Sequence, residues 1–132
     1  MPGMQTRNGK AFEYAMLDAL YGVCVENQEV VREGSPSLNV ARECFENQSQ
    51  PEKDRMRLAA DCAARLFIRM EPQLVNPLNN RPLVLKIQED RRGQAGDVRD
   101  IITLRTNNDW EIGISCKHNH YATKHSRLSP TI

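Results

Sequence analysis

The sequence predicts an α/β fold of the α+β type, in which N-terminal helices pack on a mixed, mainly antiparallel sheet. Apolar residues in the first half of the chain recur with the period of a helix, whereas those between residues 82 and 117 alternate with the period of a strand. Short Gly- or Asn-containing links separate the strands, which favours antiparallel neighbours. The 132 residues are enough for a single domain with one core.

The composition is that of an ordinary globular protein. Charged residues make up 27% and hydrophobic residues 39% of the chain. No apolar run approaches the roughly 18 residues of a membrane-spanning helix, and the N-terminus lacks the apolar segment of a signal peptide. The four cysteines show no C-x-x-C spacing, which argues against a disulfide scaffold and favours a reducing compartment. We therefore expect a cytoplasmic protein with no membrane partner.

The segment 8–72 is predicted to be helical. Its first helix begins with Asn8 as the N-cap, and a shorter second helix follows a turn at residues 35–37. The third helix opens on "SQPE", a capping box with Pro in the first turn, and ends before Pro72. Its spacing predicts an apolar face made of Met56, Ala60, Ala63, Phe67 and Met70.

The segment 82–117 is predicted to form three strands. "LVLKIQ" alternates strictly, and "DIITLR" and "WEIGISCK" flank a turn whose paired Asn residues tolerate positive φ. The polar residues 118–132 are expected to form a loop. Because a sheet with helices on one side would normally continue, we expect the chain to be truncated.

The turn between the last two strands decides which side chains share a face of this hairpin. If it is centred between the two Asn residues, residues whose numbers sum to 215 oppose each other, so Asp100 lies opposite Ser115. A register shifted by one residue would place Asp97 opposite Lys117 instead. We favour Asp100 because it leads directly into the apolar run of its strand. The face of Asp100 and Ser115 also carries Glu111, Gly113 and Lys117.

An acid opposite a Ser-x-Lys strand end can support metal-assisted hydrolysis of a phosphodiester. The Asp100 carboxylate and the Cys116 carbonyl are oxygen ligands that Mg²⁺ accepts. A metal ion would lower the pKa of a bound water, and Lys117 would orient that water and offset negative charge. The alternative is a half-exposed hairpin whose polar face carries a solvated Asp and a solvated Lys.

The hairpin resembles a known nuclease family. "GDVRDI" followed by "WEIGISCK" is similar to the PD-(D/E)XK core, and "GDVRDIITLR…WEIGISCKHNHYATKHSRLS" resembles HaeIII-type type II restriction endonucleases. "GKAFEYA" resembles the first helix of such enzymes. The resemblance implies a restriction-endonuclease-like α/β fold and Mg²⁺-dependent hydrolysis of double-stranded DNA, with Mn²⁺ as a substitute. It also implies cleavage within GGCC to leave 5′-phosphate ends, defence against foreign DNA, and a homodimer in the full-length protein.

Carried over residue by residue, Asp100 matches the first acid of the family pattern and Lys117 matches its lysine. Ser115 departs from the pattern, because Asp or Glu usually stands there. The missing carboxylate could come from Glu13, beside the apolar face of the first helix, or from Glu111, about 13 Å along the strand. The alternative for Glu13 is an ordinary surface residue in the first helical turn. The residues expected to hold the metal are Asp100, Cys116, Asp97 and Glu111.

The three histidines all follow the last predicted strand. The letters "HNH" do not make an HNH nuclease, whose histidines lie tens of residues apart. Zinc binding by "C-x-H-x-H" would lack a second ligand pair, so no zinc is expected, and a small zinc protein stays an alternative. A solvated polar loop is the other alternative. Because Asn and Arg can read bases while Lys and His meet phosphates, DNA contacts are predicted for His118, Asn119, His120, Lys124, His125 and Arg127.

The sequence thus predicts the catalytic portion of a type II site-specific endonuclease. An alternative of another class is a non-catalytic DNA-binding or assembly module with a vestigial nuclease fold. The departure at Ser115 and the short chain favour that alternative.

Overall fold

The computed structural model describes residues 4–75, 82–89, 99–105, 110–117 and 122–127. The helices are α1 (Met4–Cys24), α2 (Pro36–Glu46) and α3 (Gln50–Met70), with short 3-10 turns at η1 (Val25–Asn27) and η2 (Pro72–Leu74). The strands are β1 (Val30–Arg32), β2 (Leu83–Ile87), β3 (Ile101–Arg105), β4 (Trp110–Lys117) and β5 (Ala122–Arg127). No helix in these segments is both long and apolar enough to span a membrane.

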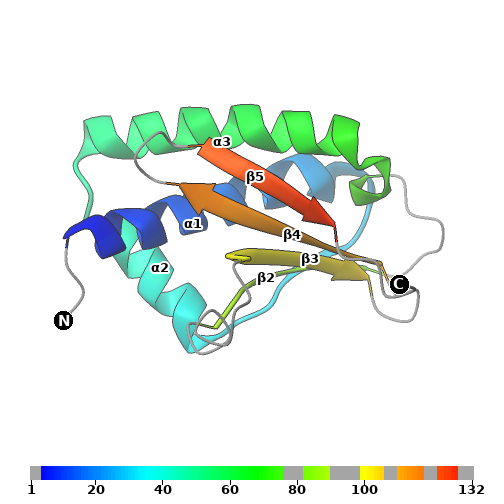
Figure 1. Ribbon diagram of the computed structural model, residues 1–132, viewed down its shortest axis with the longest axis horizontal. Helices are drawn as coiled ribbons and strands as arrows, with labels where there is room; N and C mark the ends of the chain where they lie inside the picture. Colours follow the sequence, from blue (N-terminus) through cyan, green and yellow to red (C-terminus); the bar gives the residue numbers. More distant parts are fainter. Residues whose placement is uncertain (1–3, 76–81, 90–98, 106–109, 118–121, 128–132) are drawn as a thin grey trace.

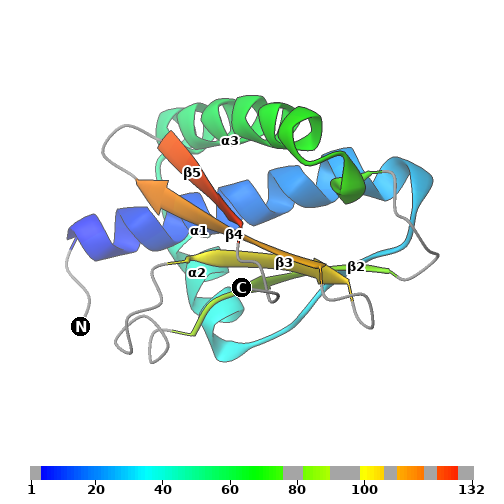
Figure 2. The same ribbon diagram turned by 45° about the vertical axis from the view of Figure 1, so that its right-hand side comes forward.

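The described strands form one sheet in the order β1-β2-β3-β4-β5. β1 runs parallel to β2, and every other neighbouring pair is antiparallel. Helix α1 crosses one face of the sheet and packs against both α2 and α3 (Figures 1 and 2). The predicted fold class, helices on a mixed and mainly antiparallel sheet, is therefore confirmed.

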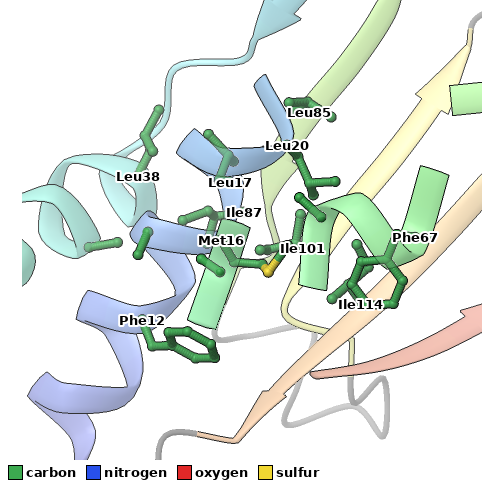
Figure 3. Close-up of a cluster of buried hydrophobic side chains, with 14 of the residues drawn as sticks. Phe12, Met16, Leu17, Leu20, Leu38, Phe67, Leu85, Ile87, Ile101 and Ile114 are labelled. Atoms are coloured by element: carbon green, nitrogen blue, oxygen red, sulfur yellow. The ribbon is translucent and has the colours of Figure 1, made fainter. Parts of the chain in front are cut away.

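The hydrophobic core lies between α1 and the sheet. Phe12, Met16 and Leu20, four residues apart along α1, are fully buried. They face the alternate side chains of β2 and the apolar residues of the central hairpin (Figure 3). This packing brings α1 into contact with β2 and with β4, the strand at whose end the candidate site lies. The sheet side of the core consists of Leu83, Leu85, Ile87, Ile101, Ile112 and Ile114.

The N-caps of α2 and α3 follow the predicted chemistry, whereas that of α1 does not. Ser35 and Ser49 accept hydrogen bonds from main-chain N–H groups three residues on, and a Pro follows in each first turn. Helix α1 begins at Met4, so the prediction of Asn8 as its N-cap is wrong. The Oδ1 of Asn8 instead accepts a hydrogen bond from Gln48 Nε2 at 3.1 Å.

Helix α3 is buried along a slightly different stripe from the one predicted. Its buried residues are Met56, Ala60, Ala64 and Phe67, whereas Met70 is 47% exposed. Helical geometry explains the difference, because steps of four residues rotate the stripe towards Ala64 and away from Met70. Placing Met70 in the buried face was therefore wrong.

Two strands of the structure were not predicted. The prediction of a polar loop over residues 118–132 is wrong for the part that forms β5, which pairs with β4 from Ile112↔Arg127 to Lys117↔Ala122. Pairing satisfies the main-chain N–H and C=O groups that an edge strand would expose, and it requires no apolar side chains. The short strand β1 was not predicted, because three residues are too few to show an alternation of apolar and polar side chains.

Arg105 lies at the end of β3 and points into the core, where it is 2% exposed. Its Nη2 donates to Gln28 Oε1 at 2.7 Å and to the Leu74 carbonyl at 3.2 Å. Gln28 also donates to the Leu74 carbonyl. The buried guanidinium thus ties the end of the sheet to η2 through carbonyl oxygens. Nearby, burial raises the pKa of the Cys24 thiol to about 11, with Arg105 partly opposing the rise.

The free energy of unfolding is expected to fall as the pH rises from about 9 to about 11. The folded state keeps Cys24 protonated, so the stabilisation is complete below the unfolded pKa of 9.0 and is lost as the pH passes the folded pKa of about 11. The loss attributable to this thiol is about 3 kcal/mol at most. In urea unfolding across this pH range, the free energy of unfolding should decline less steeply for Cys24→Ala than for the wild type. Equal declines would contradict the prediction.

Candidate active site

The central hairpin has the register that the sequence predicts. Ile101 pairs with Ile114 and Leu104 with Glu111, so the paired numbers sum to 215. The register shifted by one residue is therefore absent from this part of the sheet. Asp97, the metal-ligand candidate that the shifted register would have favoured, lies outside the described residues, as do the turn residues 106–109.

The two faces of the hairpin differ as predicted. Ile101, Thr103, Ile112 and Ile114 are buried towards the helices, and partly buried Cys116 packs against the same core. The opposite face carries Glu111, Gly113 and Ser115, which alternate with those core residues along β4. Lys117 is the last residue of β4 and continues the alternation of Glu111, Gly113 and Ser115. Its main chain pairs with Ala122. The structure describes no side chain beyond Cys116.

Asp100 is anchored to the end of β4 through both its main chain and its side chain. Its Oδ2 accepts a hydrogen bond from the Cys116 N–H at 2.7 Å. Its own N–H donates to the Ile114 carbonyl at 2.9 Å, and its carbonyl accepts from the Gln88 N–H at 2.8 Å. The acid before β3 therefore lies against the Ser-Cys-Lys end of β4. The ladder begins at Ile101↔Ile114, so the pairing of Asp100 with Ser115 stays a prediction.

Glu13 is a half-buried residue of α1, the helix that packs against the sheet. Burial raises the pKa of the Cys116 thiol well above its usual value, and the carboxylates of Asp100 and Glu13 raise it further. For Asp100 the cause is direct, because its Oδ2 accepts a hydrogen bond from the Cys116 N–H. Glu13 raises the pKa of the Cys44 thiol as well. Because α1 begins at Met4, Glu13 lies well inside the helix. The alternative of a solvated first-turn glutamate does not hold.

Glu111, the other candidate for the missing carboxylate, is engaged elsewhere. Its Oε2 forms an ion pair with Arg99 Nη1. Sequence reasoning singled out Glu111 but missed Arg99. Gly113 was the available signal, because a glycine inside a strand often marks a close approach by another group. Here that group is the Arg99 side chain, which lies against Gly113.

The residues predicted to contact DNA fall partly outside the described structure. His118, Asn119 and His120 lie in the segment that is not described. Lys124, His125 and Arg127 have main chains within β5, where they pair with Ser115, Ile114 and Ile112. The structure thus places the main chain of one half of this segment beside β4.

The donor groups near Asp100 match the preferences of Mg²⁺. Within the described segments, no three His, Cys, Asp or Glu side chains gather into a metal-binding cluster. Mg²⁺ does not require such a cluster, because it keeps several waters and binds through one or two carboxylates. The carboxylates of Asp100 and Glu13 and the Cys116 carbonyl would supply oxygen donors. The raised pKa of the Cys116 thiol makes it a poor zinc ligand, because zinc binds the thiolate.

The structure is of the α+β class, with helices packed on a mixed sheet and the Asp100 carboxylate at the end of the strand that Lys117 closes. The chain belongs to the HaeIII restriction endonuclease family, whose model matches residues 9–132. It is 39% identical over 132 residues to the type II restriction enzyme HaeIII of Haemophilus aegyptius. That match covers all of this chain but 41% of the relative, so the chain spans less than half of the relative's length. No solved structure gives a significant match.

Proposed function

We propose that this chain carries the catalytic site of a Mg²⁺-dependent type II endonuclease that hydrolyses phosphodiester bonds of double-stranded DNA. The observation that carries the proposal is the 2.7 Å hydrogen bond from the Cys116 N–H to Asp100 Oδ2, which sets an acid beside the end of β4. Membership of the HaeIII family supports the reaction class. The relative that matches the whole chain is itself a type II restriction enzyme.

In this proposal the chain's own groups have distinct roles. Asp100 and Glu13 hold the cation together with the Cys116 carbonyl, and Lys117 orients the attacking water. The metal, when bound, acts as a Lewis acid that offsets charge on the phosphate in the transition state. Ser115 stands at the family's usual acid position, and its hydroxyl can hydrogen-bond water but supplies no negative charge. We assign the second carboxylate to Glu13, because Glu111, the other candidate, is paired with Arg99.

The finer properties of the enzyme are proposals from the resemblance. They comprise cleavage within GGCC to leave 5′-phosphate ends, Mg²⁺ with Mn²⁺ as a substitute, a homodimer in the longer protein, and defence against foreign DNA in the cytoplasm. The polar segment after β4 supplies DNA contacts in this scheme, because Lys, His, Asn and Arg suit phosphates and base edges.

A non-catalytic DNA-binding or assembly module is the second candidate function. Two observations favour it. Ser115 replaces a carboxylate of the family pattern, and the chain spans less than half of the length of its relative. The second candidate differs from the first in that no phosphodiester bond is broken.

Supercoiled plasmid incubated with this chain is expected to become nicked or linear with Mg²⁺ or Mn²⁺ and to stay intact with EDTA. In the proposed site the carboxylates of Asp100 and Glu13 hold the divalent cation, which is the reason for the metal dependence. Sequencing the ends would test the GGCC site and the 5′-phosphates. DNA retained in a mobility-shift assay without any cleavage in either metal would contradict the proposal and support the second candidate.

A further inference from the structure

The Arg99 side chain lies along the face of β4 that is turned away from the core helices. Its Nη1 forms an ion pair with Glu111 Oε2. The Arg99 side chain is 13% exposed, whereas that of Glu111 is 41% exposed. An arginine poised for a DNA phosphate would present its guanidinium to solvent, but this one is largely covered and already paired. Its role therefore lies within the protein.

Gly113 makes room for this arrangement. A Cβ added at this position would lie 1.9 Å from Cδ and 2.4 Å from Cγ of Arg99. No side chain larger than hydrogen fits there unless Arg99 moves. Gly113 lies in β4 between Glu111 and Ser115, opposite Ile102. The aliphatic part of Arg99 thus occupies the side-chain space of residue 113, and its guanidinium reaches Glu111.

Arg99 directly precedes Asp100, so the contacts of the Arg99 side chain restrain the position of the Asp100 main chain just before β3. Asp100 contacts β4 through its own N–H and through its carboxylate. We propose that Arg99 is a positioning residue, which clamps the entry of β3 onto β4 through Gly113 and Glu111 and so holds the Asp100 carboxylate at the Cys116 N–H. The importance of this clamp for catalysis rests on the proposed function. The clamp itself is a property of the hairpin.

Amide hydrogen exchange measured by NMR on the whole chain tests the clamp without any need for cleavage. In Arg99→Ala the Cys116 amide is expected to exchange about 10- to 100-fold faster than in the wild type, because its hydrogen bond to a charged acceptor is lost. Arg99→Lys keeps both the stem and the charge and should restore most of the protection. Arg99→Met keeps an aliphatic side chain that can pack over Gly113 but removes the charge that pairs with Glu111. It therefore separates the contribution of packing from that of the ion pair.

Gly113→Ala provides a second, independent variant. The added methyl group should displace Arg99 and accelerate the exchange of the Cys116 amide. If Arg99 is the group displaced, the double variant Gly113→Ala/Arg99→Ala should exchange no faster than Arg99→Ala. Additive effects of the two substitutions would overturn the clamp.

The matched control is Arg65→Ala, which breaks the 3.0 Å exposed ion pair with Asp61 on α3 and should leave the Cys116 amide unchanged. The amides of Thr103 and Ile112, which pair in the middle of the hairpin, serve as an internal reference. Unchanged exchange at Cys116 in Arg99→Ala would overturn the proposal. An equal acceleration at Thr103 and Ile112 would also overturn it, because Arg99 would then be a general structural residue.

A magnesium titration of plasmid nicking adds the catalytic readout. Arg99→Ala should raise the Mg²⁺ concentration for half-maximal cleavage about tenfold, with much of the rate recovered at high Mg²⁺ and DNA binding in EDTA unaltered. An unchanged magnesium dependence would show that Asp100 is not positioned through Arg99. A wild-type chain that never cleaves would refute the proposed function, while the exchange experiment would still decide the clamp.

Discussion

Replacing Asp100 with Asn is expected to lower Mg²⁺-dependent cleavage about 1000-fold or more while leaving the fold intact. The Asn side chain keeps an oxygen that can accept the hydrogen bond from the Cys116 N–H, so the hairpin geometry survives. It loses the negative charge that holds the cation. A bound metal contributes several kcal/mol to transition-state stabilisation, and each 1.36 kcal/mol corresponds to a tenfold change in rate. The measurement is the single-turnover rate of plasmid cleavage at several Mg²⁺ concentrations.

Asp18→Asn is the matched control for this experiment. Asp18 lies on α1 and forms an exposed pair with Arg32 at 3.3 Å. Exposed pairs of this kind contribute at most about 1 kcal/mol to stability, so cleavage should stay within about twofold of the wild type. If Asp100→Asn cleaved the plasmid as fast as the wild type, the assignment of Asp100 as a metal ligand would be refuted. Circular dichroism and urea unfolding would confirm that both variants fold.

Lys117→Ala is expected to lower cleavage about 100- to 1000-fold and to leave both folding and DNA retention nearly unchanged. The main chain of Lys117 is paired with Ala122 at the end of β4, and this pairing does not depend on the side chain. The loss follows from removing a positive charge beside the phosphate that is attacked, an effect of the size seen when one preorganised donor is deleted. The measurement is again single-turnover cleavage, with the mobility shift measured in EDTA.

Lys86→Ala gives a control on the neighbouring strand. Lys86 pairs with Ile102, so it is a positive charge on the same face of the sheet as Gly113 and near the Asp100 end of β3, but it has no role in the proposed site. Its loss should leave the cleavage rate within about twofold. Equal losses in Lys86→Ala and Lys117→Ala would indicate a general effect of surface charge. Full activity in Lys117→Ala would refute the assignment of this lysine.

The hairpin of β3 and β4 shows which structural features a local sequence pattern can predict. Alternation between apolar and polar residues assigns the faces of β3 and β4, and a short turn between them leaves one register that keeps both apolar faces on the core. The register of β3 and β4 was predictable for this reason, and the observed pairs from Ile101↔Ile114 to Arg105↔Trp110 agree. The caps of α2 and α3 were predictable for a similar reason, because an N-cap is read from residues three positions apart.

Three of the misses share a physical cause, since each of them depends on segments distant in the chain. Strand β5 has no apolar alternation, and its pairing is decided by the open edge of β4. The start of α1 and the engagement of Asn8 with Gln48 depend on the packing of α1 against α2. The ion pair between Arg99 and Glu111 depends on how the chain before β3 crosses Gly113. No spacing within a single element encodes these contacts.

By itself, the sequence determined the helical first half and the register of the central hairpin, because periodicity and turn length are local properties of a chain. The tertiary structure decided which carboxylates are available near the end of β4. Asp100 contacts the Cys116 N–H, whereas Glu111, although close in sequence and on the expected face, is held by Arg99. Glu13, the second carboxylate that we propose, lies about 100 residues earlier in the chain, on a helix whose apolar face packs against the sheet. Burial of that face, which no local pattern encodes, therefore decides where Glu13 lies relative to the hairpin.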